Sequence, residues 1–210
     1  MQIKIFYHTK LNYTPVEKNS NFSESPEKPA KFIEYLREKD LLKHFTIEEN
    51  FPPFEKQDFY IAHQRKWVDD FFSGSGKLQR KNILGIPWSA EYANSVKYTN
   101  SCLYHAIRQS IVNPDEICLA PVSGFHHANP RTGALFCAFS GQVIASYKIY
   151  KEFGLSGCYI DLDGHYGNSI DNSYGFVPEL EKAIPKEIGN INIESRHEAQ
   201  KDEGTQQVLP

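Results

Sequence analysis

The chain has 210 residues, enough to bury the core of one domain, because domains commonly contain about 100–200 residues. Its formal net charge of −3 at pH 7 provides no electrostatic basis for binding nucleic acid or an anionic membrane surface. No apolar run approaches the roughly 18 residues of a membrane span, and the 4 cysteines form no C-x-x-C pair, which favours a reduced, cytoplasmic protein.

The hydrophobic pattern predicts strands that alternate with helices, which indicates an α/β fold. Short apolar or alternating runs predict strands at residues 3–8, 117–122 and 158–160. Apolar residues at helical spacing predict helices at residues 30–42, 61–72, 89–112, 134–153 and 170–184. The charged, amide-rich stretch after residue 193 predicts disorder. We therefore expect one domain over residues 1–193 and a polar tail over residues 194–210.

Two polar clusters follow two of the predicted strands. His126 and His127 come after the first of them, and Asp161, Asp163 and His165 come at the end of the next. The intervening helix predicts a right-handed crossover between parallel strands, so both clusters lie past strand C-termini. Ligand sites in open α/β sheets form at that edge. We therefore expect the two clusters to converge.

Asp163 and His165 stand two positions apart, a spacing that lets a turn direct a carboxylate and an imidazole at one metal ion. This pair of donors suits Zn²⁺ or Fe²⁺ better than Ca²⁺ or Mg²⁺. Metal ligands beside two titratable imidazoles are the groups needed to activate a water for amide hydrolysis. The sequence therefore predicts a metal-dependent amidohydrolase site.

The same motifs resemble those of the histone deacetylase family, which includes bacterial acetylpolyamine and acetoin-utilisation relatives. The resemblance is carried by Gly124-Phe125-His126-His127-Ala128, by Phe136-Cys137 and by Asp161-Leu162-Asp163-Gly164-His165-Tyr166-Gly167-Asn168. It covers most of the chain and implies the arginase/deacetylase fold, a mostly parallel sheet with helices on both faces. It also implies a substrate that is an acetylated small molecule, such as a polyamine, or an acetyl-lysine.

Carried over residue by residue, the resemblance implies that Asp163 and His165 are two of the three protein ligands of a catalytic Zn²⁺ or Fe²⁺. His127 would serve as general base and acid, and His126 would be its electrostatic neighbour. Asp161 would hold the His126 ring and contribute to a structural monovalent-cation site.

The resemblance implies further roles around this centre. Asn168 would orient His127, in a position where other members carry Asp, and Phe136 would form one wall of a narrow acyl-lysine channel. Leu135 stands where many members have Gly, a departure that we expect to alter the width of the channel. We expect His63, which an N-terminal match places on a helix, to pack under the active-site loop in a structural role.

The family also uses a third metal ligand, an Asp, and a later Gly-Gly-Tyr whose phenol polarises the scissile carbonyl. The 210 residues contain no Gly-Gly-Tyr. Asp171 follows the metal motif too closely to be the third ligand, and Asp202 lies in the polar tail. We therefore expect a deacetylase domain that lacks its C-terminal part, with activity impaired accordingly.

Two other interpretations remain open at this point. A catalytically inactive remnant would keep half of the site and act as a binding module. An arginase-type ureohydrolase with two manganese ions is disfavoured, because Gly167 stands where the Asp-x-His-x-Asp pattern places its second Asp.

Overall fold

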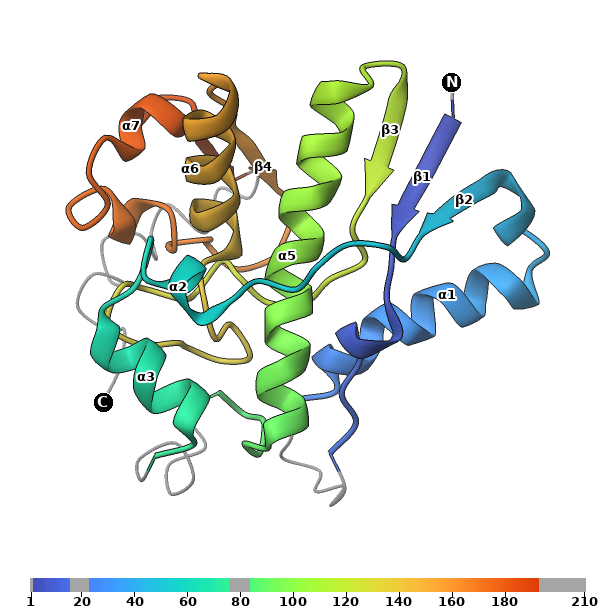
Figure 1. The fold of residues 1–210 in the computed structure, drawn as a ribbon, viewed down its shortest axis with the longest axis horizontal. Coiled ribbons are helices and arrows are strands. Elements are labelled where there is room, and N and C mark those ends of the chain that lie inside the picture. The colour runs from blue at the N-terminus through green and yellow to red at the C-terminus, as the bar shows by residue number, and fades with distance from the viewer. Residues whose placement is uncertain (1, 16–22, 76–83, 193–210) are drawn as a thin grey trace.

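The computed structural model describes residues 2–15, 23–75 and 84–192, and its strands in those ranges form two parallel sheets (Figure 1). In the first sheet, β1 lies between β2 and β3, and in the second, β4 pairs with β5. The strands are β1 (Gln2–Phe6), β2 (Phe45–Glu48), β3 (Glu116–Leu119), β4 (Tyr159–Asp161) and β5 (Asn190–Asn192). The predicted α/β class with parallel strands is confirmed, although β2 and β5 were not predicted.

The longest helix of the described residues runs through the middle of the molecule (Figure 1). The helices are α1 (Lys28–Glu38), α2 (Lys56–Phe59), α3 (Arg65–Ser73), α5 (Ala90–Val112), α6 (Gly141–Phe153) and α7 (Leu180–Ala183). Short 3₁₀ helices lie at Thr9–Leu11, Ser25–Glu27, Leu42–His44 and Asp171–Ser173. The central helix α5 contacts α6 as well as β1 and β3. It begins where we predicted, because the Ser89 hydroxyl accepts the backbone N–H of Tyr92 at 3.0 Å.

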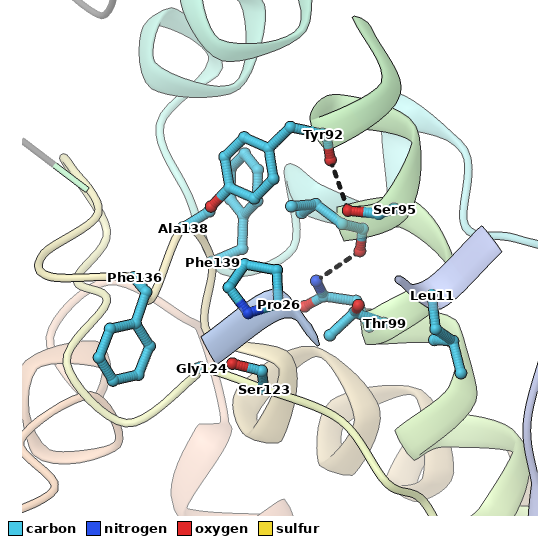
Figure 2. Close-up of a pocket in the computed structure, with 12 residues that line it drawn as sticks. Leu11, Pro26, Tyr92, Ser95, Thr99, Ser123, Gly124, Phe136, Ala138 and Phe139 are labelled. Atoms are coloured by element: carbon cyan, nitrogen blue, oxygen red, sulfur yellow. Dashed lines mark hydrogen bonds between the residues drawn. The ribbon is translucent and has the colours of Figure 1, made fainter. Parts of the chain in front are cut away.

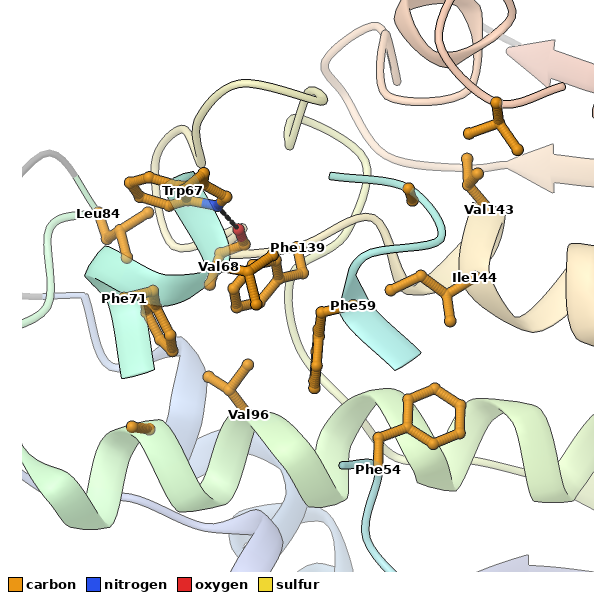
Figure 3. Packing of buried hydrophobic residues seen from close by; sticks show 14 of the residues in the cluster. Phe54, Phe59, Trp67, Val68, Phe71, Leu84, Val96, Phe139, Val143 and Ile144 are labelled. Carbon is orange, nitrogen blue, oxygen red and sulfur yellow. Dashed lines mark hydrogen bonds between the residues drawn. The ribbon is translucent and has the colours of Figure 1, made fainter. Parts of the chain in front are cut away.

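The larger hydrophobic core surrounds Phe139, a fully buried residue just ahead of α6 (Figure 3). Its ring centroid lies 4.6 Å from that of Phe59 and 4.9 Å from that of Phe71, both also fully buried. The indole of Trp67 donates to the Ala138 carbonyl at 3.1 Å. These contacts attach the segment before α6 to α3, which sets the position of the loop that carries the candidate channel residues.

The helix predicted at residues 61–72 is wrong at its beginning. Helix α2 ends and α3 starts on either side of a break that contains His63. The ring of His63 lies 2.9 Å from the Asn129 carbonyl oxygen, and the backbone N–H of Gln64 donates to the Pro130 carbonyl at 2.7 Å. A continuous helix would use that backbone N–H internally, so these long-range bonds account for the break.

The helix predicted at residues 134–153 is wrong in its first seven positions, because α6 begins only at Gly141. Ala134 and Cys137 instead close a tight turn through two backbone hydrogen bonds, of 3.1 and 3.0 Å. The apolar residues between them and α6 are buried by packing of this loop on the core, as Phe139 is. These apolar residues are therefore spaced as in a helix because they are buried in an irregular loop, and the spacing does not reflect a helix.

The helix predicted at residues 170–184 is also wrong over most of its length. A 3₁₀ turn at Asp171–Ser173 and the single-turn helix α7 replace it. Between them the backbone of Glu179 adopts a left-handed conformation with φ of 59°, which a continuous helix excludes.

The two strands joined by α6 do not pair with each other, because β3 and β4 belong to separate sheets. In the second sheet, Ile160 and Ile191 are paired in register and are 62% and 41% exposed. Leu162, just after β4, is 76% exposed. Parallel sheets normally bury both faces, so this surface is unusual for its class.

The polar tail predicted at residues 194–210 lies outside the described residues, so the domain boundary at residue 193 stays a prediction. Within the described ranges, none of the helices has both the length and the apolar character needed to cross a membrane.

Candidate metal centre

The loops that follow β3 and β4 meet, although the strands themselves lie in separate sheets. The rings of His126 and His127 lie 4.0 Å apart between centroids, and that of His165 lies 5.9 Å from His127. The Nε2 atom of His126 lies 4.0 Å from Oδ1 of Asp163. Asp161, at the end of β4, bonds to His126 as well, so all five residues of the two clusters form one group.

Asp163 and His165 present two metal-binding atoms side by side. Oδ1 of Asp163 accepts the backbone N–H of His165 at 2.8 Å and lies 3.1 Å from Nδ1 of its ring. A tetrahedral zinc with bonds of about 2.0–2.2 Å separates two such ligand atoms by about 3.3–3.5 Å. The two donor types therefore suit zinc, and their separation of 3.1 Å, a hydrogen-bond distance, is slightly shorter than that between neighbouring ligands of one zinc ion.

Among the residues that the structure describes, no group of three or more His, Cys, Asp or Glu side chains could hold a metal ion. Catalytic zinc sites usually have three protein ligands. Asp171, which we expected not to be the third ligand, has other partners: it accepts the Tyr166 hydroxyl and lies 3.2 Å from Nδ2 of Asn190. Asp202, which we expected to lie in the polar tail, is outside the described residues.

Each of the paired histidines has its own partner at Nδ1. For His126 the partner is Oδ2 of Asp161 at 2.9 Å, and for His127 it is Oδ1 of Asn168 at 3.2 Å. Both partners are acceptors, so each ring donates from Nδ1. A neutral His127 ring then has its lone pair at Nε2.

The burial of the cluster sets its protonation states. Burial lowers the pKa of His127, and the adjacent His126 ring lowers it further. Burial raises the pKa of Asp161, but the hydrogen bonds from His126 and from the backbone of Asp163 outweigh this effect and lower it overall. The pKa of Asp163 is lowered in the same way, with burial opposed by hydrogen bonds from His165. At neutral pH, His127 is therefore neutral and both carboxylates are ionised.

Gly167 and two asparagines of β5 support the cluster, and sequence reasoning did not identify them as site residues. The Gly167 N–H donates to Oδ1 of Asn192 at 2.8 Å, and its carbonyl accepts Nδ2 of Asn190 at 2.8 Å. A Cβ at Gly167 would collide with Oδ2 of Asp161 and would come within 3.2 Å of Cβ of His126. In the sequence, the two asparagines stand two positions apart and so share one face of a strand, which is the pattern that could have indicated this role.

The candidate channel residues lie on the tight turn between Ala134 and Cys137. Leu135 is 53% exposed, whereas Phe136 is half-buried and has the Lys28 ammonium 5.8 Å from its ring centroid. Figure 2 shows Phe136 beside Gly124, on one side of a small cavity that Phe139 and Tyr92 also line. The turn therefore lies next to the segment that leads into the two histidines.

His63 is buried beneath the loop of residues 129–140, which contains this turn, and its ring bonds to the first and last residues of that loop. Its Nδ1 donates to the Asn129 carbonyl at 2.9 Å, and its Nε2 accepts the Ser140 N–H at 2.9 Å. Burial lowers its pKa to about 3, so the ring is neutral. The Ser140 hydroxyl in turn bonds to that of Ser169, whose N–H donates to the His126 carbonyl at 2.8 Å. A chain of buried polar groups thus connects His63 to the candidate site.

The chain is similar to known proteins in sequence and in fold. The histone deacetylase domain model matches residues 22–179. Histone deacetylase HDA1 of Saccharomyces cerevisiae is 23% identical over 198 residues, which cover 82% of this chain and 27% of the yeast protein. The crystal structure of the HDA15 HD domain matches with a TM-score of 0.70 at 15% identity, over 83% of this chain and 50% of that one.

The chain thus spans about a quarter of the length of the yeast relative and half of that of the solved structure. The structural match shows a common fold, and the family model extends over most of the chain. On this basis the chain belongs to the histone deacetylase domain family.

Proposed function

We propose that this chain provides the metal-binding pair and the proton-transfer histidines of a deacetylase that hydrolyses an N-acetyl amide of a lysine or polyamine. The observation that carries the proposal is the convergence of Asp163 and His165 with two histidines whose Nδ1 atoms have separate partners. The family is typically zinc-dependent and acts on acetylated substrates, which agrees with the donor set.

The metal would be held by Oδ1 of Asp163 and Nδ1 of His165, together with at least one donor from outside the described residues. Zn²⁺ or Fe²⁺ held there would supply Lewis-acid chemistry toward the acetyl carbonyl and a water molecule. In the structure Nδ1 of His165 donates to Oδ1 of Asp163, so binding of the metal would displace this proton. Because Asp163 is ionised at neutral pH, it provides the negative charge that favours a divalent cation.

His127 is the general base of the proposed reaction. Its Nδ1–H is occupied by Asn168, so it accepts a proton at Nε2 from the attacking water and returns it to the leaving amine. The neutral state that burial imposes on His127 is the state that a base requires. His126 packs against this ring, and Asp161 holds His126 in place.

Metal content tests the ligand pair directly. After dialysis against zinc and then against buffer, His165→Ala should retain less zinc than the unmodified chain. His44→Ala is the matched control, because His44 is exposed and lies at the end of a 3₁₀ helix far along the chain from the site. Equal zinc content in His165→Ala and the unmodified chain would remove the ligand assignment.

Turnover of an acetyl-lysine peptide and of an N-acetylpolyamine tests the base. His127→Ala should reduce the rate by about 10²–10⁴-fold while zinc content stays unchanged. We expect the unmodified chain itself to be slow, because the 210 residues contain no Gly-Gly-Tyr and a carbonyl-polarising donor contributes about 10²–10³-fold. Zinc binding without any turnover would favour a binding module, and unchanged turnover in His127→Ala would exclude His127 as the base.

A further inference from the structure

A cyclic hydrogen-bond network encloses the backbone of the paired histidines. The His63 ring donates to the Asn129 carbonyl and accepts the Ser140 N–H, both at 2.9 Å. The Ser140 hydroxyl bonds to that of Ser169, whose N–H donates to the His126 carbonyl at 2.8 Å. The backbone of residues 126–129 closes the cycle. The network therefore holds the chain on both sides of the second histidine, which is the proposed base.

The serine pair lies in the interior, where its hydroxyls have no access to bulk water. Ser140 and Ser169 are fully buried, and His63 is 1% exposed. Ser140 is the residue before α6, a position in which a serine hydroxyl normally caps its helix. Its side chain makes no capping hydrogen bond and bonds to Ser169 instead. The hydroxyl of Ser140 is thus used to join two separate segments and not to complete its own helix.

Ser169 is held at each of its polar groups. Its N–H and its hydroxyl belong to the network, and its carbonyl accepts the Ser173 hydroxyl at 2.8 Å. The residue before it is Asn168, whose Oδ1 lies 3.2 Å from Nδ1 of His127. Since the backbone at Ser169 is fixed, the direction in which the Asn168 side chain leaves the backbone is fixed as well.

We propose that Ser140 and Ser169 are positioning residues, which act through Asn168 to hold His127 in the tautomer with its proton at Nδ1. The hydrogen bond at one ring nitrogen of a neutral histidine decides which nitrogen carries the proton. A His127 ring with its proton at Nε2 has no lone pair there to accept a proton from water. This inference rests on the proposed function for the role of His127 as base, whereas the tautomer and its dependence on the serine pair do not.

Nuclear magnetic resonance of the full chain with ¹⁵N-labelled histidine tests the tautomer, because a ring nitrogen shifts when it gains a proton. The signals that are missing from His127→Ala identify His127. At pH 7 they should show the Nδ1–H tautomer alone in the unmodified chain and a mixture of both tautomers in Ser169→Ala. Ser101→Ala is the matched control, because Ser101 is also fully buried and its hydroxyl donates to the Pro52 carbonyl, outside the network. A single tautomer in Ser169→Ala, or an equal mixture in Ser101→Ala, overturns the proposal.

A double variant separates positioning from a general loss of stability. Ser140→Ala and Ser169→Ala each leave one buried hydroxyl without its partner, so each should lower the Tm by at least about 2 °C. The variant with both substitutions should recover most of that loss, because removal of both partners of a buried hydrogen bond is nearly neutral. It should nevertheless keep the mixture of His127 tautomers. Recovery of the single tautomer together with the Tm would mean that the serines act through stability alone, which overturns the positioning role.

Turnover of an acetyl-lysine peptide connects the tautomer to the proposed reaction. In Ser169→Ala, kcat should fall in proportion to the fraction of His127 that carries its proton at Nε2, while KM stays unchanged. An unchanged kcat in a variant with mixed tautomers overturns the catalytic meaning of the positioning. Absence of turnover in the unmodified chain overturns the proposed function, while the tautomer comparison still decides whether the serine pair positions His127.

Discussion

The buried His63 should make the stability of this protein depend on pH in a range where most side chains do not titrate. The folded ring is neutral, with a pKa of about 3 that results from burial, whereas an exposed histidine has a pKa of about 6.5. Between these values the unfolded chain binds one more proton at this position than the folded chain. The free energy of unfolding therefore decreases as pH falls from 6.5 toward 3, and the contribution is fully present above pH 6.5.

The magnitude follows from the linkage relation. One proton of difference corresponds to about 1.4 kcal/mol per pH unit, so lowering the pH from 6.5 to 5 should remove about 2 kcal/mol. This is a substantial part of the roughly 5–15 kcal/mol by which domains are stable. Asp161 and Asp163 also have lowered pKa values, but carboxylates contribute to the pH dependence only at more acidic pH.

Urea unfolding of the unmodified chain and of His63→Gln, at pH 7, 6 and 5, isolates this contribution. Glutamine can still donate to the Asn129 carbonyl and accept the Ser140 N–H, but it does not titrate. His63→Gln should be less stable at pH 7, because an imperfect buried hydrogen bond costs about 1–3 kcal/mol. The difference between the two proteins should then shrink by about 2 kcal/mol at pH 5. Burial also lowers the pKa of His127, which contributes equally to both proteins and cancels.

Parallel stability curves would refute this reasoning. If the difference between the unmodified chain and His63→Gln stays constant from pH 7 to pH 5, His63 gains its proton equally in the folded and unfolded states. The buried pair of hydrogen bonds described for its ring would then be absent in solution.

Two further predictions concern the packing around the site. Gly167→Ala should destabilise the fold by about 1–3 kcal/mol in a thermal or urea titration, because its Cβ would collide with the carboxylate of Asp161. Gly164→Ala is the control, since a Cβ there meets nothing within 4 Å, and it should leave the stability unchanged. Destabilisation by both variants to the same degree would contradict the close packing. Replacement of the exposed, paired Ile160 and Ile191 by Thr should reduce binding of a hydrophobic dye and self-association at micromolar concentration, while Val112→Thr on α5, also exposed, should have no effect. Unchanged dye binding in the double variant would show that Ile160 and Ile191 do not form the surface that binds the dye.

Local patterns in the sequence determined several features of the protein. The serine cap at residue 89 and the apolar spacing behind it predicted α5, because a helix of this length is specified by its own cap and period. Short apolar runs predicted β1, β3 and β4. The Asp163-x-His165 spacing placed a carboxylate and an imidazole together, because residues two apart in a turn are close whatever the rest of the chain does. The family resemblance likewise depended on contiguous motifs.

Only the tertiary structure decided the features that depend on distant residues. The break at His63 comes from bonds to a loop more than sixty positions away, and the irregular segment before α6 is held by burial against α3. The support of the site by Gly167 and the asparagines of β5, and the hydrogen-bond network through Ser140 and Ser169, likewise involve contacts between separate segments. Apolar spacing reports that a residue is buried but not which partner buries it, so these long-range hydrogen bonds and close backbone contacts become visible only in the folded chain.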